Sequence, residues 1–130
     1  MGMIDQDHPA ASWFLLLAPT VFLIVYALPL LVAPFRWARL FRWTVNERDD
    51  LALYFGRCLG ALAVAVCAAC YRVAPHPLGG AIFFDLIAAA GVLLAGVHIW
   101  GAIEKRQPFI ETVEILLYLG LAVLSVVLRP

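Results

Sequence analysis

Long apolar stretches alternate with short polar segments along this chain. Four stretches hold few charged residues and cover Ser12–Phe35, Leu51–Tyr71, Ala81–Ala102 and Phe109–Leu128. Each is close to the ~20 residues that a helix rising ~1.5 Å per residue needs to cross a ~30 Å hydrocarbon core. The pattern therefore predicts an all-α integral membrane protein, a four-helix bundle with up-down-up-down topology.

Composition agrees with a chain that lies in lipid. The sequence is 65% hydrophobic and 14% charged, whereas roughly a quarter of the residues in a globular domain are charged. The connecting segments are too short to form a soluble domain, so we expect residues 1–130 to form one transmembrane domain. The net charge of zero argues against a nucleic-acid partner.

Basic residues predict the orientation. Six of them follow the first and third stretches, and only Arg72 and Arg129 lie at the other side. An excess of Lys and Arg marks cytoplasmic loops, so we expect both termini outside the cytoplasm. The six are Arg36, Arg39, Arg42, Arg48, Lys105 and Arg106.

The first stretch and the segment after it carry signals of irregular structure. Pro19 and Pro29 each remove a backbone donor and predict a bend. In Phe35–Asp50, arginines alternate with aromatic residues, a pattern typical of a short helix lying among lipid head groups.

Small residues predict where the helices approach one another. Gly56 and Gly60 lie four apart in the second stretch, and Gly91 and Ala95 lie four apart in the third. Membrane helices pack closely through such residues, so we expect the tightest contact between the second and third helices.

Five ionisable residues fall inside the predicted spans, where such residues are costly and often functional. Arg57 needs an anion, and Glu114 (or Glu111) is the nearest in predicted depth, so we expect an ion pair between them. On the opposite side, Asp85 is expected to pair with Arg72. The cluster can be a structural ion pair, or a polar pocket for a lipid or quinone head group or for proton transfer. At about 1.5 Å per residue, four of the residues share a layer near the cytoplasmic side and form this cluster: Arg57, His98, Glu111 and Glu114. Asp85, in the opposite leaflet, is the fifth candidate site residue.

Two cysteines and one histidine raise the question of redox or metal chemistry. Cys67 and Cys70 form a CxxC pair on one helix face, but no second pair exists to relay electrons, and cysteine also serves as a small apolar residue. His98 is the one histidine inside the spans, so a bis-histidine haem or a zinc site lacks partners. We therefore expect no metal and no cofactor.

The middle of the chain resembles the family of the ergosterol-biosynthesis scaffold protein, which consists of small four-helix membrane proteins. Arg57-Cys58-Leu59-Gly60 matches its Arg-x-x-Gly, Phe84-Asp85 resembles its Tyr-Asp, and His98 followed by Glu104 resembles its His and Glu. The Arg-and-Gly pattern is also similar to that of DoxX-like four-helix proteins. The resemblance implies a non-catalytic role in tethering membrane enzymes.

These observations favour a small membrane scaffold or accessory subunit without enzymatic activity. Its expected partners are membrane lipids and a larger membrane protein or further copies of the chain, in a bacterial inner membrane or an endoplasmic-reticulum-type membrane. The alternative is a membrane protein, with or without enzymatic activity, that binds a lipid- or quinone-type molecule in a pocket at Arg57, His98 and Glu114.

Overall fold

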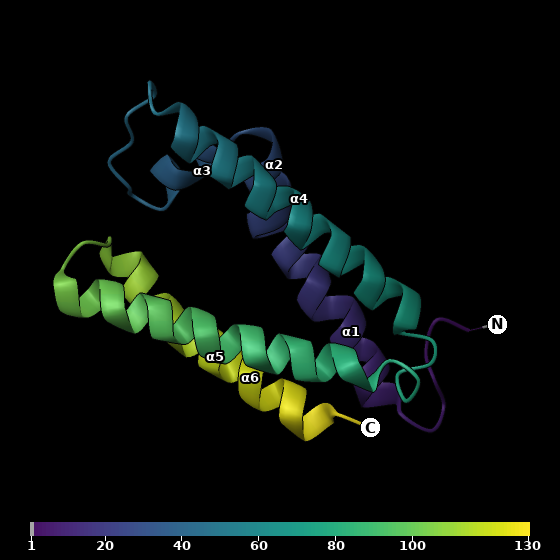
Figure 1. The fold of residues 1–130 in the computed structure, drawn as a ribbon. Coiled ribbons are helices and arrows are strands. Elements are labelled where there is room, and N and C mark those ends of the chain that lie inside the picture. The colour runs from purple at the N-terminus through teal and green to yellow at the C-terminus, as the bar shows by residue number, and fades with distance from the viewer. Residues whose placement is uncertain (1) are drawn as a thin grey trace.

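The computed structural model describes residues 2–130, and all regular structure in this part of the chain is helical (Figure 1). Four of its helices are long and apolar enough to cross a membrane, with bounds within three residues of the predicted stretches. The elements are α1 Pro9–Phe22, the π-helix η1 Leu23–Ala27, α2 Leu28–Val32, α3 Pro34–Leu40, α4 Asp50–Val73, α5 Ala81–Glu104 and α6 Phe109–Leu128.

The first span is continuous from α1 through α2, and its irregular turn has a local cause. Pro29 has no N–H group, so the carbonyl of Val25, four residues earlier, loses its helical donor. The Trp37 indole of α3 donates to this Val25 carbonyl at 2.9 Å. The wide turn η1 ends at Ala27, two residues before Pro29, and contains Val25, so the irregular structure falls where this proline predicts it.

A short helix follows this span, as the Arg and aromatic pattern predicts. Ala33 leaves the helical conformation and Pro34 begins α3, as expected of proline at the first turn of a helix. Trp37 and Phe41 stack with ring centroids 4.5 Å apart, and Tyr26 of η1 packs against both rings. These contacts hold α3 against the first span.

The helices form two pairs, and this corrects the predicted packing. The segment α1–η1–α2 packs along α4, while α5 packs along α6. The expected close contact between α4 and α5 is not among the principal helix contacts. In Figure 1 the pairs converge near the two termini and diverge toward the α3–α4 and α5–α6 connections.

Glycines explain this pairing. A Cβ atom on Gly60 would lie 2.7 Å from the Leu31 Cα atom and 2.9 Å from the Ala27 carbonyl oxygen. On Gly91 it would lie 2.8 Å from the Tyr118 carbonyl oxygen of α6. The small residues of α4 and α5 therefore do mark seams, but each seam faces a different partner from the one predicted.

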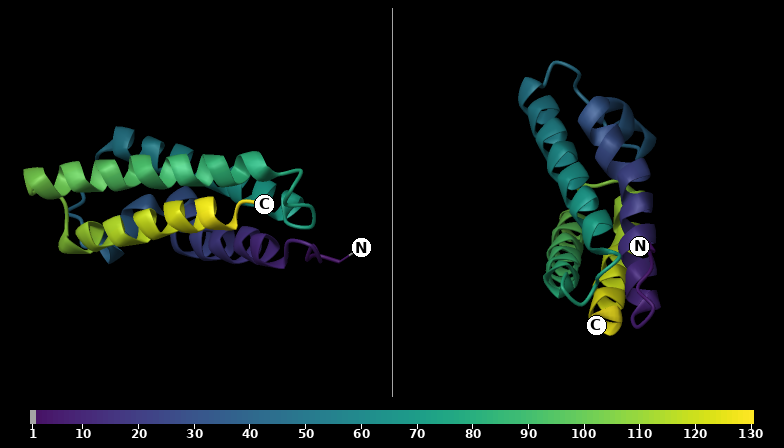
Figure 2. Two further views of the ribbon diagram at one scale, coloured as in Figure 1. Left: turned by 90° about the horizontal axis from the view of Figure 1, so that it is seen from below. Right: turned by 90° about the vertical axis from the view of Figure 1, so that its right-hand side faces the viewer.

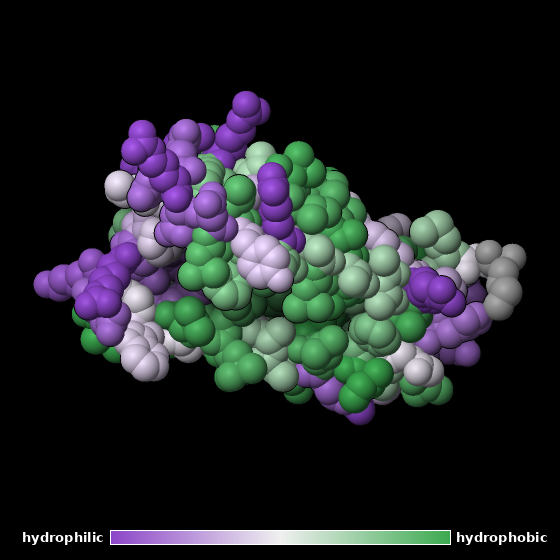
Figure 3. Space-filling view, turned by 45° about the horizontal axis from the view of Figure 1, so that its top comes forward, coloured by the Kyte–Doolittle hydropathy of each residue, from purple (hydrophilic) through white to green (hydrophobic). Residues whose placement is uncertain are grey.

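The pairs meet around an apolar junction at the end where both termini lie (Figure 2). Phe14 and Leu15 of α1, Cys70 of α4 and Phe84 of α5 are buried together there. The Ser12 hydroxyl donates to the Ala74 carbonyl oxygen at 2.7 Å and ties α1 to the α4–α5 connection. Elsewhere, hydrophobic side chains dominate the middle of the face in Figure 3 and hydrophilic ones gather toward its ends, as expected of a chain embedded in lipid.

Candidate functional site

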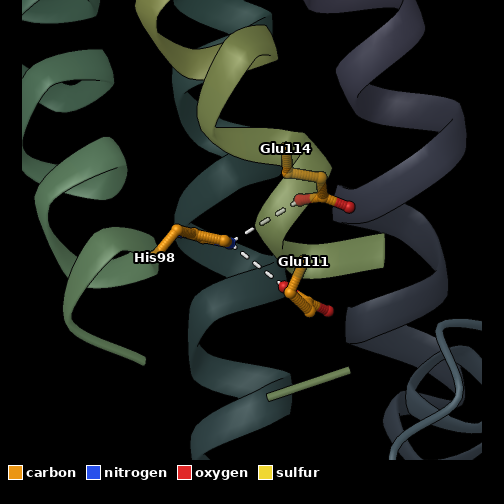
Figure 4. A group of neighbouring side chains, drawn as sticks. All are labelled: His98, Glu111 and Glu114. Carbon is orange, nitrogen blue, oxygen red and sulfur yellow. Dashed lines mark hydrogen bonds and ion pairs between the residues drawn. The ribbon is translucent and has the colours of Figure 1, made fainter. Parts of the chain in front are cut away.

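Three ligand-type side chains converge between α5 and α6 (Figure 4). His98 Nε2 lies 3.1 Å from Glu111 Oε2 and 3.7 Å from Glu114 Oε2. Glu111 is 5% exposed and Glu114 7%. We call His98, Glu111 and Glu114 the polar trio.

The turn between α5 and α6 brings these residues together. Lys105 ends α5 in the left-handed conformation, and Pro108 precedes the first turn of α6. Gln107 donates from Nε2 to the His98 carbonyl oxygen at 2.9 Å and to the Thr112 hydroxyl at 3.1 Å. The Gln107 side chain thus joins α5 to α6 beside the polar trio.

The His98 ring is held in one orientation. Nδ1 lies 2.7 Å from the carbonyl oxygen of Leu94, one turn earlier. A carbonyl oxygen only accepts, so Nδ1 carries a proton, and Nε2 is the nitrogen that faces the two carboxylates. The Tyr118 ring also packs on the imidazole, with centroids 4.8 Å apart.

A second set of groups surrounds the carboxylates. The Trp43 indole, from the α3–α4 connection, donates to Glu111 Oε1 at 2.6 Å, and the Tyr118 hydroxyl donates to Glu114 Oε2 at 3.3 Å. Tyr26 of η1 faces Glu114, yet Glu114 Oε1 is buried without a hydrogen-bond partner. Three of the four spans therefore contribute to this site, namely the first span, α5 and α6.

The tyrosines were not predicted as site residues, and Trp43 belongs to the segment Phe35–Asp50, for which the sequence predicts a place among lipid head groups. Glu111, Glu114 and Tyr118 follow an i, i+3, i+7 spacing, which lies on one helix face, so Tyr118 was recognisable. Trp43 and Tyr26 come from distant segments, and no local spacing relates them to α6.

Arg57 does not join the polar trio, which corrects the predicted pair with Glu114. Its side chain is exposed, and it forms no ion pair within residues 2–130. The buried face of α4 contains Gly60, Ala63, Cys67 and Cys70. At about 100° of rotation per residue, Arg57 falls beside that face rather than on it.

Asp85 lies near the end of the molecule that carries the termini, away from the polar trio. Its carboxylate accepts from Arg129 Nε at 2.8 Å and from Arg129 Nη2 at 3.1 Å, and these bonds raise the pKa of the Arg129 guanidinium. Arg129, rather than the expected Arg72, is therefore its partner, because the end of α6 passes beside the start of α5.

Cys67 and Cys70 are both free and buried. Cys67 Sγ donates to the Pro19 carbonyl oxygen at 3.5 Å, and Cys70 packs in the apolar junction. Both thiols therefore pack against the first span, as expected of cysteine used as a small apolar residue, and a redox role for the pair stays an untested alternative.

A cleft of about 360 Å³ lies between α2, α3, the α3–α4 connection and α4, with Glu111 in its wall. Pro34, Trp37 and Trp43 are among the apolar and aromatic residues that line it. Thr44, Asn46 and Asp49 add polar groups from the connection. Glu111 therefore belongs both to this cleft and to the polar trio.

No family model matches this chain, and neither a curated protein nor a solved structure matches it. The fold and span lengths define an all-helical membrane protein. The resemblance to the ergosterol-biosynthesis scaffold family stays a prediction, carried by the few residues quoted for it.

Proposed function

We propose that this protein binds a lipophilic molecule of the lipid or quinone type, with the polar head group against the polar trio. The observation that carries the proposal is that Glu111 is shared by the aromatic cleft and the buried trio. The protein would act as a binding protein for this molecule within the membrane.

The chemistry of the cleft suits such a ligand. Ligand sites are mostly apolar concavities of about 300–1,000 Å³ with a few convergent polar groups, and the volume of about 360 Å³ falls within this range. Trp37 and Trp43 offer flat apolar faces, while Glu111 and the adjoining His98 offer groups that bind hydroxyls or carbonyls.

The proposed placement in the membrane puts the site near one surface. We take the chain to have up-down-up-down topology with both termini outside the cytoplasm, in a bacterial inner membrane or an endoplasmic-reticulum-type membrane. His98 is six residues from the end of α5 at Glu104, or about 9 Å along the helix. The head group would then lie at the inner boundary of the hydrocarbon core, with its tail toward the bilayer centre.

Purification in a mild detergent, followed by mass spectrometry of the extracted lipids, tests this proposal. We expect one lipophilic species in near-stoichiometric amount with the wild type, and its loss from Glu111→Gln. Glu104→Gln is the matched control, because Glu104 is exposed and, within residues 2–130, its side chain bonds only to Trp100 and Arg106. Equal lipid content in both variants, or no enrichment over a detergent blank, would contradict the proposal.

A scaffold or accessory-subunit role is the second candidate, and Arg57 favours it. This arginine is exposed within the span of α4 and has no ion-pair partner in the described chain. A charge inside a span requires an anion, which a neighbouring membrane protein could supply. A stoichiometric protein partner that co-purifies with the wild type and is lost from Arg57→Gln would support this role. A wild-type protein that purifies without any protein partner would oppose it.

A further inference from the structure

We propose that the polar trio is a binding site for one divalent first-row transition-metal cation such as Zn²⁺. The inference rests on the proposed function in one respect, because Glu111 belongs both to the polar trio and to the wall of the cleft. His98 Nε2 and one oxygen from each of Glu111 and Glu114 would be the ligands, and all three atoms lie within 4.8 Å of one another.

Charge balance is the first argument. When both carboxylates are ionised they carry two negative charges, and no lysine or arginine pairs with either of them within residues 2–130. A protonated His98 would compensate only one charge, yet buried charges are normally paired or bind metals. A divalent cation beside a neutral His98 makes the group neutral.

The spacing of the ligand atoms is the second argument. Zn²⁺ binds His nitrogen and carboxylate oxygen at about 2.0–2.2 Å, so two ligands in tetrahedral arrangement lie about 3.4 Å apart. The distances from His98 Nε2 to the two carboxylates are 3.1 Å and 3.7 Å. Side-chain shifts of a few tenths of an ångström therefore bring both pairs to the required distance.

The surroundings of the ligands are the third argument. Metal-binding histidines usually donate their other ring N–H to a carbonyl or carboxylate, and ligating carboxylates are themselves hydrogen-bonded. Here His98 Nδ1 bonds to Leu94, Trp43 donates to Glu111, and Tyr118 donates to Glu114. Nε2 itself makes a hydrogen bond with Glu111 Oε2 at 3.1 Å, and the cation would bind between these two atoms in place of that bond.

Glu114 supplies an independent indication that a partner is missing. Within residues 2–130 its Oε1 atom is buried and makes no hydrogen bond, even with the Tyr26 hydroxyl nearby, although buried polar atoms are nearly always satisfied. Small rotations of this carboxylate would let either oxygen bind the cation. Asn46 and Asp49 line the cleft that reaches Glu111, and a cation would enter from the aqueous side along these polar side chains.

Calorimetric titration of Zn²⁺ into the metal-stripped, full-length protein in detergent tests the inference. We expect one equivalent to bind, with affinity at least 100-fold lower in His98→Ala and in Glu114→Gln and unchanged in Glu104→Gln. Tyr118→Phe, which removes only a surrounding hydrogen bond, should lose roughly 10-fold. Circular dichroism and gel filtration of each variant serve as the control for folding.

X-ray absorption at the zinc edge of the wild type needs no variant. We expect nitrogen and oxygen ligands at about 2.0–2.2 Å with an imidazole contribution, whereas a sulfur shell at about 2.3 Å would assign the zinc to cysteines and overturn the inference. Absence of binding, or equal binding in all variants, would also overturn it. If the protein retains a lipophilic molecule but does not bind zinc, the cation site is refuted and the proposed function is not. If it binds zinc but retains no such molecule, the proposed function is refuted and the cation site is not.

Discussion

Replacing Gly60 with alanine places a methyl group where the backbone of the first span already lies. The added Cβ would overlap the Leu31 amide nitrogen, lie 2.7 Å from the Leu31 Cα atom and lie 2.9 Å from the Ala27 carbonyl oxygen. Backbone atoms cannot rotate away as a flexible side chain can, so α4 has to move outward from η1 and α2.

The expected cost can be isolated with a matched control. Overpacking a close contact typically costs about 1–3 kcal/mol. Gly96 lies inside α5, and a Cβ there meets nothing within 4 Å. Gly96→Ala therefore gains the same helix propensity, about 0.5–1 kcal/mol, without the clash. The difference between the two variants measures the contact alone, and we expect Gly60→Ala to be less stable than Gly96→Ala by roughly 1–3 kcal/mol.

Unfolding in mixed micelles with increasing denaturing detergent, followed by circular dichroism, measures both free energies of unfolding. Gly120→Ala is a second control, since a Cβ on Gly120 also meets nothing within 4 Å. If Gly60→Ala were as stable as the two controls, α4 would not pack on the first span as described, and the pairing of the helices would be wrong.

Three further predictions follow from individual contacts. Trp43→Phe removes the indole donor to Glu111 and should lower the free energy of unfolding by about 1.5–3 kcal/mol; no change would show that the connection does not dock on α6. Phe84→Ala empties a fully buried position and should cost about 3–5 kcal/mol, whereas Phe109→Ala, at a position 81% exposed, should cost far less; similar costs would contradict the apolar junction. In a double-mutant cycle, Arg57→Ala and Glu114→Ala should be additive within about 0.5 kcal/mol, and a larger coupling would restore the pair predicted from the sequence.

The spans were predictable because length and apolarity are local properties. The α6 bounds, Phe109–Leu128, coincide with the predicted stretch, and the other bounds differ by up to three residues. The pairing of helices was not predictable, because rows of small residues occur on both α4 and α5 and do not specify which neighbour they face. Gly60 meets Leu31, and Gly91 meets Tyr118 and Ala122.

The candidate site shows the same division between local and distant information. Predicted depth correctly grouped His98 with Glu111 and Glu114, since a fixed rise per residue places them at similar heights. Depth does not specify the direction in which a side chain points, and for this reason Arg57 was wrongly added. The prediction of no metal was based on the presence of a single histidine inside the spans. In the structure, two carboxylates lie beside that histidine as possible further ligands.

The central claim is that the polar trio is a binding site rather than a structural ion pair. The most direct test compares the unfolding free energy of Glu114→Gln with that of the wild type, both stripped of metal and lipid. With both carboxylates ionised, the empty site carries one negative charge more than a protonated His98 can compensate, so our account predicts that Glu114→Gln is at least as stable as the wild type. A structural ion pair would instead lose about 3–5 kcal/mol when one partner is removed, and a loss of that size would contradict the account.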